Sequence, residues 1–290
     1  MKNVIITGAN SGLGFETAKK IAKDPAYRVI LACRNPEKAA DAKEKIVSET
    51  GNANVETMTL DTSLLSSVRT FAEEYKKTYG TVDALVNNAG ISPMHGGMTE
   101  EGFELVFATN YLGHFLLTLL LLPSMAADAR IFNVTSDMHN PPGGSMEWKG
   151  TDYLAYEAAE DRRRYSYSKL CAIYFTHALN RLFEKKGLTV TANSFNPGYM
   201  AATNFSGPGV DKARSLVVKT TMPERYGELA SSSDALAQVV TDPAFARVTN
   251  EYFDRSTNTK QSSELSYDQK NEEELWKASL GYCGLSEDEI

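Results

Sequence analysis

The sequence is poor in the residues that build disulfide frameworks and metal centres. It has three cysteines, Cys33, Cys171 and Cys283, and four histidines among 290 residues. An odd number of widely spaced cysteines is typical of a reducing compartment and argues against a disulfide scaffold. No histidine pair has the HExxH spacing or a similar metal-ligand spacing, so we expect no metal site.

Positive charge is also scarce. Thirty lysines and arginines stand against 37 aspartates and glutamates, which gives a net charge of -7. A mildly acidic surface argues against a nucleic-acid groove and offers no attraction to an anionic membrane. We therefore predict a small-molecule substrate and no nucleic-acid partner.

Long hydrophobic runs are missing too. The most apolar stretch is FLLTLLLLP, residues 115–123, whereas a membrane-spanning helix needs about 20 apolar residues. We interpret the stretch as a buried helix and predict no integral membrane segment. The first strand-like run starts at residue 3 and leaves no room for a signal peptide before it, so we expect a cytoplasmic protein.

What the sequence does contain is a regular alternation of strand-like and helical segments. Mostly apolar strands separated by helices favour a parallel sheet that is covered on both faces, and right-handed crossovers wind such a sheet doubly. We predict one α/β domain over residues 1–290, a Rossmann-type doubly wound parallel sheet with helices on both faces. The predicted strands are 3–7, 28–32, 55–59, 84–87, 130–134 and 189–195, and the predicted helices are 15–22, 36–50, 64–79, 99–124 and 165–186.

Two segments interrupt this alternation. Residues 137–164 and 200–228 are rich in glycine, proline and polar side chains. Long loops in a compact domain often cover a functional site. We predict that these two loops form a lid over the substrate.

A glycine-rich turn, TGANSGLG, follows the first predicted strand at residues 7–14. Backbone without side chains can approach a phosphate closely, and a helix that begins in the turn offers unpaired amides and a favourable dipole. The spacing is G-x-x-x-G-x-G instead of the G-x-G-x-x-G of longer dehydrogenases. The turn predicts a dinucleotide site.

The end of the second predicted strand indicates which dinucleotide binds. An acidic residue there would accept hydrogen bonds from an adenosine ribose, but this chain has Cys33 and then Arg34. A guanidinium suits a 2′-phosphate by its charge and its forked geometry. We therefore predict NADP(H) as the cofactor in preference to NAD(H).

Further motifs follow in a fixed order. They are LD at 60–61, NNAG at 87–90, Asn110 in ATNYLGHF, Ser136 in NVTS, YSYSK at 165–169 and NPG at 196–198. With the glycine turn, they make the chain similar to the short-chain dehydrogenase/reductase family, from residue 2 to about 198 and more loosely beyond. LACRN, TNYLGHFLLT and the long spacer between Ser136 and Tyr165 resemble the branch of the retinol dehydrogenases and protochlorophyllide reductases.

The resemblance implies a role for each matched residue. Asp61 would meet the adenine. Thr203 stands one place later than the threonine of the family pattern PGxxxT, so whether Thr203 contacts the nicotinamide stays open. The implied catalytic residues are Asn110, Ser136, Tyr165 and Lys169. The implied cofactor-binding residues are Gly8, Asn10, Ser11, Gly12, Leu13, Gly14, Arg34, Asp61, Asn88, Ala89, Gly90, Tyr165, Lys169, Pro197, Gly198 and Tyr199.

The chemistry explains why such a site needs these side chains. Hydride transfer leaves negative charge on a carbonyl oxygen, which must be stabilised and protonated. Tyr165 and Lys169 are four residues apart and share one helix face, and a nearby ammonium lowers the pKa of a phenol from about 10. We expect Tyr165 to be the general acid and base and Ser136 to orient the substrate oxygen. Asn110 would kink its helix and hold a water that refills the proton relay from Lys169.

The sequence thus predicts an NADP(H)-dependent oxidoreductase that interconverts a carbonyl and an alcohol on a small lipophilic substrate. One alternative is a reductase of a conjugated C=C bond, as in protochlorophyllide reductases. Another is a catalytically silent dinucleotide sensor, although sensors on this fold typically lose the tyrosine or the lysine. The long helices 99–124 and 165–186 could pair in a homo-oligomer, unless the acidic helix predicted at 271–284 covers them.

Two groups of residues close to the predicted site receive structural interpretations. His114 and His139 lie near site residues in the sequence, and we expect both to be buried histidines with structural partners. Arg162, Arg163 and Arg164 precede Tyr165, and we expect them to form a solvated edge of the lid.

Overall fold

The computed structural model describes residues 1–290 except 93, 144–145, 201–204 and 206–209. Within these residues the chain forms one sheet in the order β3-β2-β1-β4-β5-β6-β7-β8. Every neighbouring pair is parallel except β7 and β8, which are antiparallel. The strands are β1 (Lys2–Thr7), β2 (Tyr27–Cys33), β3 (Val55–Thr59), β4 (Val82–Asn87), β5 (Met125–Val134), β6 (Thr191–Asn196), β7 (Tyr252–Asp254) and β8 (Thr259–Lys260). The predicted doubly wound parallel sheet is confirmed.

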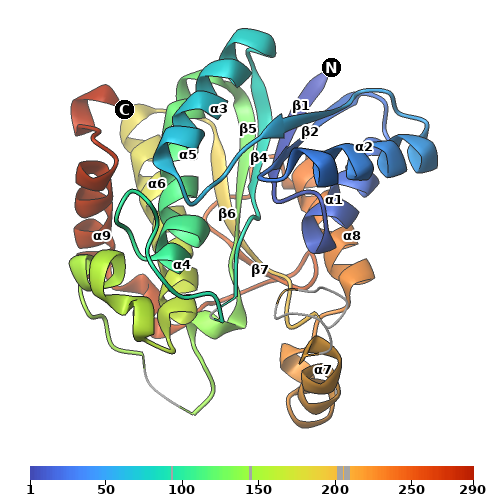
Figure 1. Cartoon of the computed structure of the whole chain (residues 1–290). Coiled ribbons are helices and arrows are strands. Elements are labelled where there is room, and N and C mark those ends of the chain that lie inside the picture. Colours follow the sequence, from blue (N-terminus) through green and yellow to red (C-terminus); the bar gives the residue numbers. More distant parts are fainter. Residues whose placement is uncertain (93, 144–145, 201–204, 206–209) are drawn as a thin grey trace.

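Helices cover both faces of the sheet (Figure 1). One layer holds α1 (Gly12–Ala22), α2 (Pro36–Thr50) and α8 (Leu229–Thr241), and the other holds α3 (Leu65–Thr78), α4 (Leu105–Phe107), α5 (Gly113–Leu121), α6 (Arg164–Lys186) and α9 (Gln269–Tyr282). Helix α7 (Val210–Thr221) lies beyond the carboxyl ends of the strands. Along β1, Val4 and Ile6 contribute to one core and Ile5 to the other, because successive strand side chains point to opposite faces.

The helix that carries Asn110 begins later than predicted. Residues 99–103 form a turn in which the Thr99 amide donates to the Phe103 carbonyl at 2.7 Å, so the predicted start at residue 99 is wrong. Helix α4 begins at Leu105 and passes through a π-helical turn, Ala108–Leu112, before α5. A π turn inserts an extra residue into a helix and is common at functional sites. Here the inserted turn contains Asn110.

The apolar stretch at residues 115–123 belongs to this helix. From Leu105 to Ser124 the helix is long and apolar enough to cross a membrane by length and composition alone. However, 89% of its most apolar window is buried inside the protein, and Phe115, Leu116 and Leu117 are fully buried. The interpretation of the stretch as a buried helix is confirmed.

The C-terminal helix α9 covers α5 and α6 on the outside of their layer (Figure 1). The Trp276 ring centroid lies 5.2 Å from that of Phe115 on α5 and 6.4 Å from that of Phe175 on α6. The hydroxyls of Tyr111 and Ser279 share a buried hydrogen bond of 2.9 Å. Part of the face through which the two long helices could pair with another subunit is therefore occupied by the chain itself.

We consequently expect the protein to be a monomer instead of the homo-oligomer that the sequence suggested. Light scattering at micromolar concentration should give a mass near 31.9 kDa. Trp276→Glu places a charge against Phe115 and Phe175 and should raise the apparent mass by loosening α9, whereas Lys277→Glu, at an exposed position of the same helix, should not. A wild-type mass of two or more chains would contradict this prediction.

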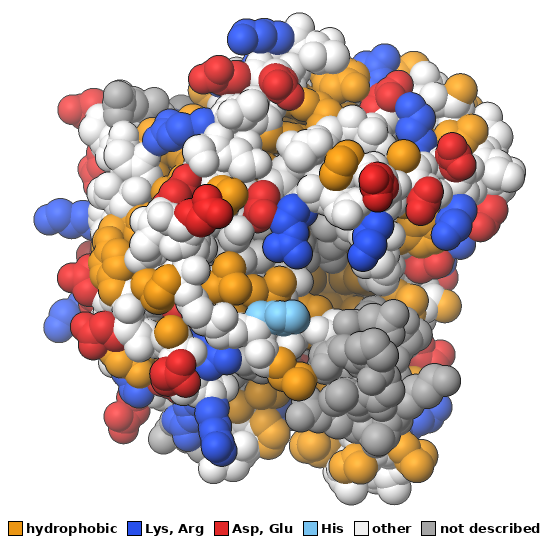
Figure 2. Space-filling view, in the orientation of Figure 1, with side chains coloured by type: hydrophobic (Ala, Val, Ile, Leu, Met, Phe, Trp, Pro, Cys, Tyr) orange, Lys and Arg blue, Asp and Glu red, His pale blue; other side chains and the backbone are white. Residues whose placement is uncertain are grey.

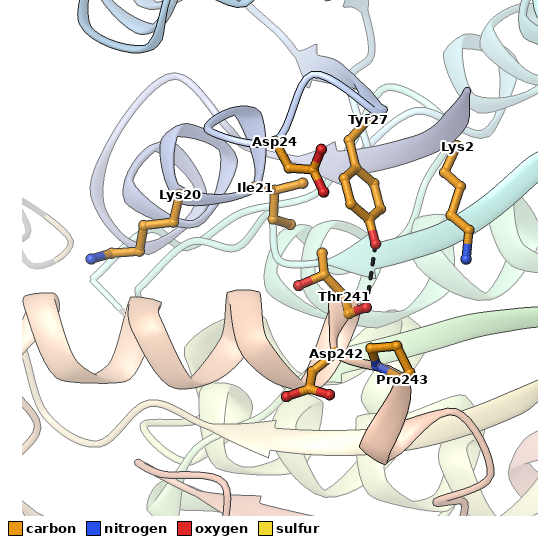
Figure 3. A pocket seen from close by; sticks show the side chains of 8 residues that line it. All are labelled: Lys2, Lys20, Ile21, Asp24, Tyr27, Thr241, Asp242 and Pro243. Atoms are coloured by element: carbon orange, nitrogen blue, oxygen red, sulfur yellow. Dashed lines mark hydrogen bonds between the residues drawn. The ribbon is translucent and has the colours of Figure 1, made fainter.

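A cavity of about 290 Å³ opens at the amino ends of the strands (Figure 3). The Tyr27 hydroxyl donates to the Thr241 carbonyl across it at 3.3 Å. Its lining residues are Lys2, Lys20, Ile21, Asp24, Tyr27, Thr241, Asp242 and Pro243. Open α/β sheets bind ligands at the carboxyl ends of their strands, so this cavity lies at the wrong end of the sheet to belong to the predicted site.

Candidate active site

The turn between β1 and α1 is a cradle of backbone amides. Gly8 and Gly12 have φ values of +65° and +56°, which residues other than glycine rarely adopt. A Cβ on Gly14 would lie 2.6 Å from the Asn88 side-chain nitrogen and 2.7 Å from the Gly8 carbonyl oxygen. Ser11 makes no side-chain cap, so the first amides of α1 can bind a pyrophosphate. The residues of the turn fit a dinucleotide.

The end of β4 is tied to this turn through Thr7. The amides of Asn88 and Ala89 donate to the buried Thr7 hydroxyl at 2.9 and 2.8 Å. The Asn88 side chain donates to the Thr7 carbonyl at 2.7 Å. Gly90 follows, where a Cβ would lie 3.2 Å from the Asn110 Oδ1 atom. Two motifs about 80 residues apart in sequence thus form one rigid edge of the cofactor site.

Arg34 and Asp61 meet at the carboxyl ends of β2 and β3. Arg34 is 69% exposed, and its Nε lies 3.9 Å from an Asp61 carboxylate oxygen. The other Asp61 oxygen accepts from the Ser63 amide and hydroxyl at 2.9 and 2.6 Å. The structure therefore brings together the two residues that were predicted for the adenosine end of the cofactor.

The remaining predicted cofactor residues lie along the same edge of the sheet. Asn10 is in the glycine turn, and Leu13 is buried in the first turn of α1. After β6, the buried Pro197 leads to Gly198, which has a φ of +75° and donates from its amide to the Asn196 side chain at 3.0 Å. The Tyr199 amide donates to the Arg225 carbonyl at 2.8 Å. Thr203 lies outside the described residues.

Ser136, Tyr165 and Lys169 converge beside this edge. Ser136 follows β5, and its side chain is close enough to the Tyr165 phenol to oppose the rise of the phenol pKa. Lys169 lies one turn further along α6, with its Nζ 5.6 Å from the centre of the Tyr165 ring. The same Nζ donates to the Val134 carbonyl at 2.9 Å. Three of the four predicted catalytic side chains therefore lie together.

Asn110, the fourth, has a positioning role in the structure. Its side-chain amide donates to the Ile91 carbonyl at 3.2 Å and to the Ser168 hydroxyl at 3.1 Å. Its Oδ1 accepts from the Ile91 amide at 2.8 Å. The side chain of Asn110 thus joins the loop after β4 to helix α6, and its part in a proton relay stays a prediction.

Burial controls the protonation of the catalytic pair in the protein alone. It raises the pKa of Tyr165 to about 12, against the opposing effect of the Ser136 side chain, and it lowers the pKa of Lys169 to about 8. The lowering of the phenol pKa by the Lys169 ammonium stays a prediction, because burial has the largest effect on this phenol and Nζ donates to the Val134 carbonyl.

The pKa of Lys169 predicts a stability effect with a definite sign. The pKa falls from its ordinary 10.5 to about 8 in the folded protein. Below pH 8 the folded and the unfolded protein therefore both carry the ammonium, and the full cost of burying it lowers the free energy of unfolding. Between about pH 8 and 10.5 the unfolded state binds more protons, and stability rises with pH. Lys169→Met should therefore raise the Tm at pH 7, by about 3 °C if the gain is near 1 kcal/mol.

The measurement compares the Tm of wild type and variant at pH 7 and pH 10, because other titrating groups cancel in the difference. The advantage of Lys169→Met should shrink at pH 10. A variant that is less stable at pH 7, or a difference that does not change with pH, would refute this account of the buried ammonium.

Arg164 differs from its two neighbours. Arg162 and Arg163 are exposed, as predicted, but the Arg164 side chain is only 11% exposed. Its Nε lies 4.0 Å from the fully buried Glu104 carboxylate, and it donates to the Asp161 carbonyl at 2.9 Å. The prediction of a solvated edge is wrong for Arg164. Sequence reasoning missed this pair because 60 residues separate the partners and neither belongs to a motif.

The two histidines that were expected to be structural are buried and hydrogen-bonded. His139 Nδ1 lies 2.7 Å from the Ser136 carbonyl oxygen, and its Nε2 accepts from the Ser263 amide at 3.0 Å. His114 lies between the Thr7 hydroxyl and the Asn110 carbonyl. Both residues therefore have structural partners, as predicted.

Comparison with known proteins decides the family. The model of the short chain dehydrogenase family matches residues 2–148. The chain belongs to the short-chain dehydrogenases. These oxidoreductases bind a nicotinamide dinucleotide on this fold, which agrees with the glycine cradle described above.

Alignments with relatives cover nearly the whole length of this short-chain dehydrogenase. It is 35% identical to Retinol dehydrogenase 13 of Homo sapiens, over 98% of this chain and 85% of that protein. It is 31% identical to the chloroplastic Short-chain dehydrogenase TIC 32 B of Brassica napus, over 95% of this chain and 87% of that protein. The crystal structure of a putative uncharacterized protein from Mycobacterium Paratuberculosis superposes with a TM-score of 0.76 at 28% identity, over 99% and 94% of the two chains. The resemblance to the retinol dehydrogenase branch is confirmed.

Proposed function

We propose that this short-chain dehydrogenase is an NADP(H)-dependent enzyme that interconverts a carbonyl and an alcohol on a lipophilic substrate. The observation that carries the proposal is the convergence of three side chains: Ser136 is close enough to the Tyr165 phenol to oppose the rise of its pKa, and Lys169 Nζ lies 5.6 Å from the centre of the Tyr165 ring. The bound cofactor supplies or accepts the hydride. Tyr165 gives its proton to the carbonyl oxygen, or takes it from the alcohol, while Ser136 orients that oxygen by a hydrogen bond.

Apolar surroundings of Tyr165 support a lipophilic substrate. The Phe205 ring packs edge-on against the Tyr165 ring with a centroid distance of 5.6 Å. Met138, two residues after Ser136, is 38% exposed. Figure 2 shows hydrophobic side chains in the depth of a hollow on this face of the molecule. The name of the related Retinol dehydrogenase 13 agrees with this substrate class.

Arg34 supports NADP(H) over NAD(H). Its guanidinium is largely exposed beside Asp61, where a 2′-phosphate could form charge-assisted hydrogen bonds with it. Such a contact contributes about 1.5–3 kcal/mol, or roughly ten- to a hundredfold in affinity.

Arg34→Ala should therefore lower the NADPH/NADH ratio of kcat/KM by about ten- to a hundredfold. Arg28→Ala is the matched control, because Arg28 lies at the other end of β2, against the Tyr79 ring. An unchanged ratio in Arg34→Ala would mean that the 2′-phosphate binds elsewhere. An equal change of the ratio in Arg28→Ala would mean that the effect is not specific to Arg34.

The proposed function is tested by following NADPH absorbance with a panel of ketones, aldehydes and enones in darkness. We expect turnover of lipophilic ketones or aldehydes. In parallel, protochlorophyllide and NADPH are mixed with the enzyme in darkness and under illumination. Light-dependent reduction of the pigment, with every carbonyl inert, would overturn the proposal in favour of a C=C reductase. Binding of NADPH without any turnover would favour a sensor.

A further inference from the structure

A hydrogen-bond chain runs from the cofactor turn to Asn110 through His114 on α5. His114 Nε2 lies 2.9 Å from the Thr7 hydroxyl oxygen, and Nδ1 lies 3.2 Å from the Asn110 carbonyl oxygen. Thr7 is fully buried, and His114 and Asn110 are each 3% exposed. One imidazole therefore contacts both Thr7 and Asn110. Thr7 ties the glycine turn to the segment after β4, and Asn110 joins that segment to helix α6.

The partners of Thr7 decide which ring nitrogen carries the proton. A hydroxyl donates one hydrogen and accepts two. The Thr7 hydroxyl already accepts from two backbone amides of the segment after β4, so it must donate to its third partner. His114 Nε2, at 2.9 Å, is closer than the Val86 carbonyl oxygen, at 3.4 Å. Nε2 is therefore the acceptor, and Nδ1–H donates to the Asn110 carbonyl.

The neutral ring is also the form that burial favours. Burial lowers the pKa of His114 to about 4, so the imidazole stays uncharged at neutral pH. A second proton on Nε2 would point at the hydroxyl hydrogen of Thr7 and break the chain. The arrangement thus holds one tautomer in one orientation.

We propose that His114 is a positioning residue of this enzyme, which links the cofactor turn at Thr7 to the backbone carbonyl of Asn110. Asn110 and Lys169 both approach Gly90, since a Cβ there would lie 3.2 Å from Asn110 Oδ1 and 3.8 Å from Lys169 Nζ. The proposal rests on the proposed function, because the Asn110 carbonyl matters only if Lys169 takes part in proton transfer. In this proposal His114 contacts neither the cofactor nor the substrate, and it acts through Thr7 and Asn110.

Two substitutions separate the two bonds of the ring. The amide of Asn extends two bonds beyond Cβ, as Nδ1 does, so His114→Asn can keep a donor to the Asn110 carbonyl and loses the acceptor for Thr7. The amide of Gln extends one bond further, as Nε2 does, so His114→Gln can keep the acceptor and loses the donor. The pair therefore tests each end of the chain by itself.

The expected results differ in kind. His114→Asn should raise the Kd of NADPH, measured by cofactor fluorescence, about five- to tenfold, the effect of one net hydrogen bond, with kcat at saturating NADPH within twofold of wild type. His114→Gln should leave that Kd within twofold and lower kcat about tenfold. A purely structural role would instead lower the Tm of both variants and change Kd and kcat together.

His177→Asn is the matched control, because His177 is also buried but contacts Asn250 and Tyr267, away from the cofactor turn. It should leave the Kd of NADPH unchanged. The proposal is overturned if the two His114 variants alter Kd and kcat by the same factors, if neither alters them, or if the control matches His114→Asn.

If the His114 variants do not fold, Thr7→Ser and Thr7→Val test the hydroxyl through which His114 acts, although Thr7→Val also removes the acceptor of the Asn88 and Ala89 amides. Thr7→Ser keeps the hydroxyl and should retain the Kd of NADPH, whereas Thr7→Val should raise it at least fivefold; equal values for the two would overturn the proposal. The Kd measurements need no substrate. A wild type that binds NADPH but reduces no carbonyl would thus refute the proposed function while the cofactor end of this proposal is still decided.

Discussion

Tyr165→Phe should lower kcat by about 10²–10⁴-fold, the usual contribution of a positioned general acid, and leave the Kd of NADPH within about twofold. The substitution removes only the phenol hydroxyl, while the ring can keep its packing against Phe205. No other phenol of the YSYSK motif can replace it, because the side chain of Tyr167 is 1% exposed and lies within the core. The measurement is steady-state turnover of whichever carbonyl the panel identifies, together with NADPH fluorescence titration.

Tyr167→Phe is the control for this experiment. It makes the same change two residues further along the same helix and should keep kcat within a few-fold of wild type. If Tyr165→Phe retained most of its turnover, Tyr165 could not be the general acid. If both variants lost activity equally, the effect would come from the helix and not from the catalytic hydroxyl.

Gly113→Ala should destabilise the protein by about 3 kcal/mol or more, because α5 crosses the segment after β3 with no room for a side chain. A Cβ on Gly113 would lie 2.0 Å from the Thr62 carbonyl oxygen and 2.8 Å from its carbonyl carbon. Backbone on both sides must move to relieve that contact. In a domain of this size the loss corresponds to a Tm lower by about 6–12 °C. The measurement is thermal unfolding at one pH with NADPH absent.

Gly281→Ala is the matched control. Gly281 is also helical, at an exposed position in the last turn of α9, and a Cβ there would meet nothing within 4 Å. Alanine is the better helix former by up to about 1 kcal/mol, so this variant should be as stable as wild type or more stable. A Gly113→Ala protein with the Tm of wild type would show that α5 can move away from Thr62 at little cost.

Local sequence was enough to predict the elements whose signals lie within a few residues. Helix α2 has the predicted bounds because Asn35 caps its first turn, Pro36 follows, and Gly51 ends it with a φ of +73°. The glycine turn is equally local, since glycine at positions 8 and 12 permits the positive φ values that the turn adopts. Motif order then predicted four catalytic residues, and the structure brings the side chains of three of them, Ser136, Tyr165 and Lys169, together.

Tertiary structure decided whatever depends on residues far apart in the chain. The Glu104–Arg164 pair, the cover of α9 over Phe115 and Phe175, and the His114 chain each join segments that no local pattern connects. The pKa values of Tyr165 and Lys169 also depend on burial, which the fold creates and the spacing of the two residues does not. Backbone propensities and turn geometry act over one or two turns of chain, whereas desolvation and side-chain pairing act through space, so only the folded arrangement determines them.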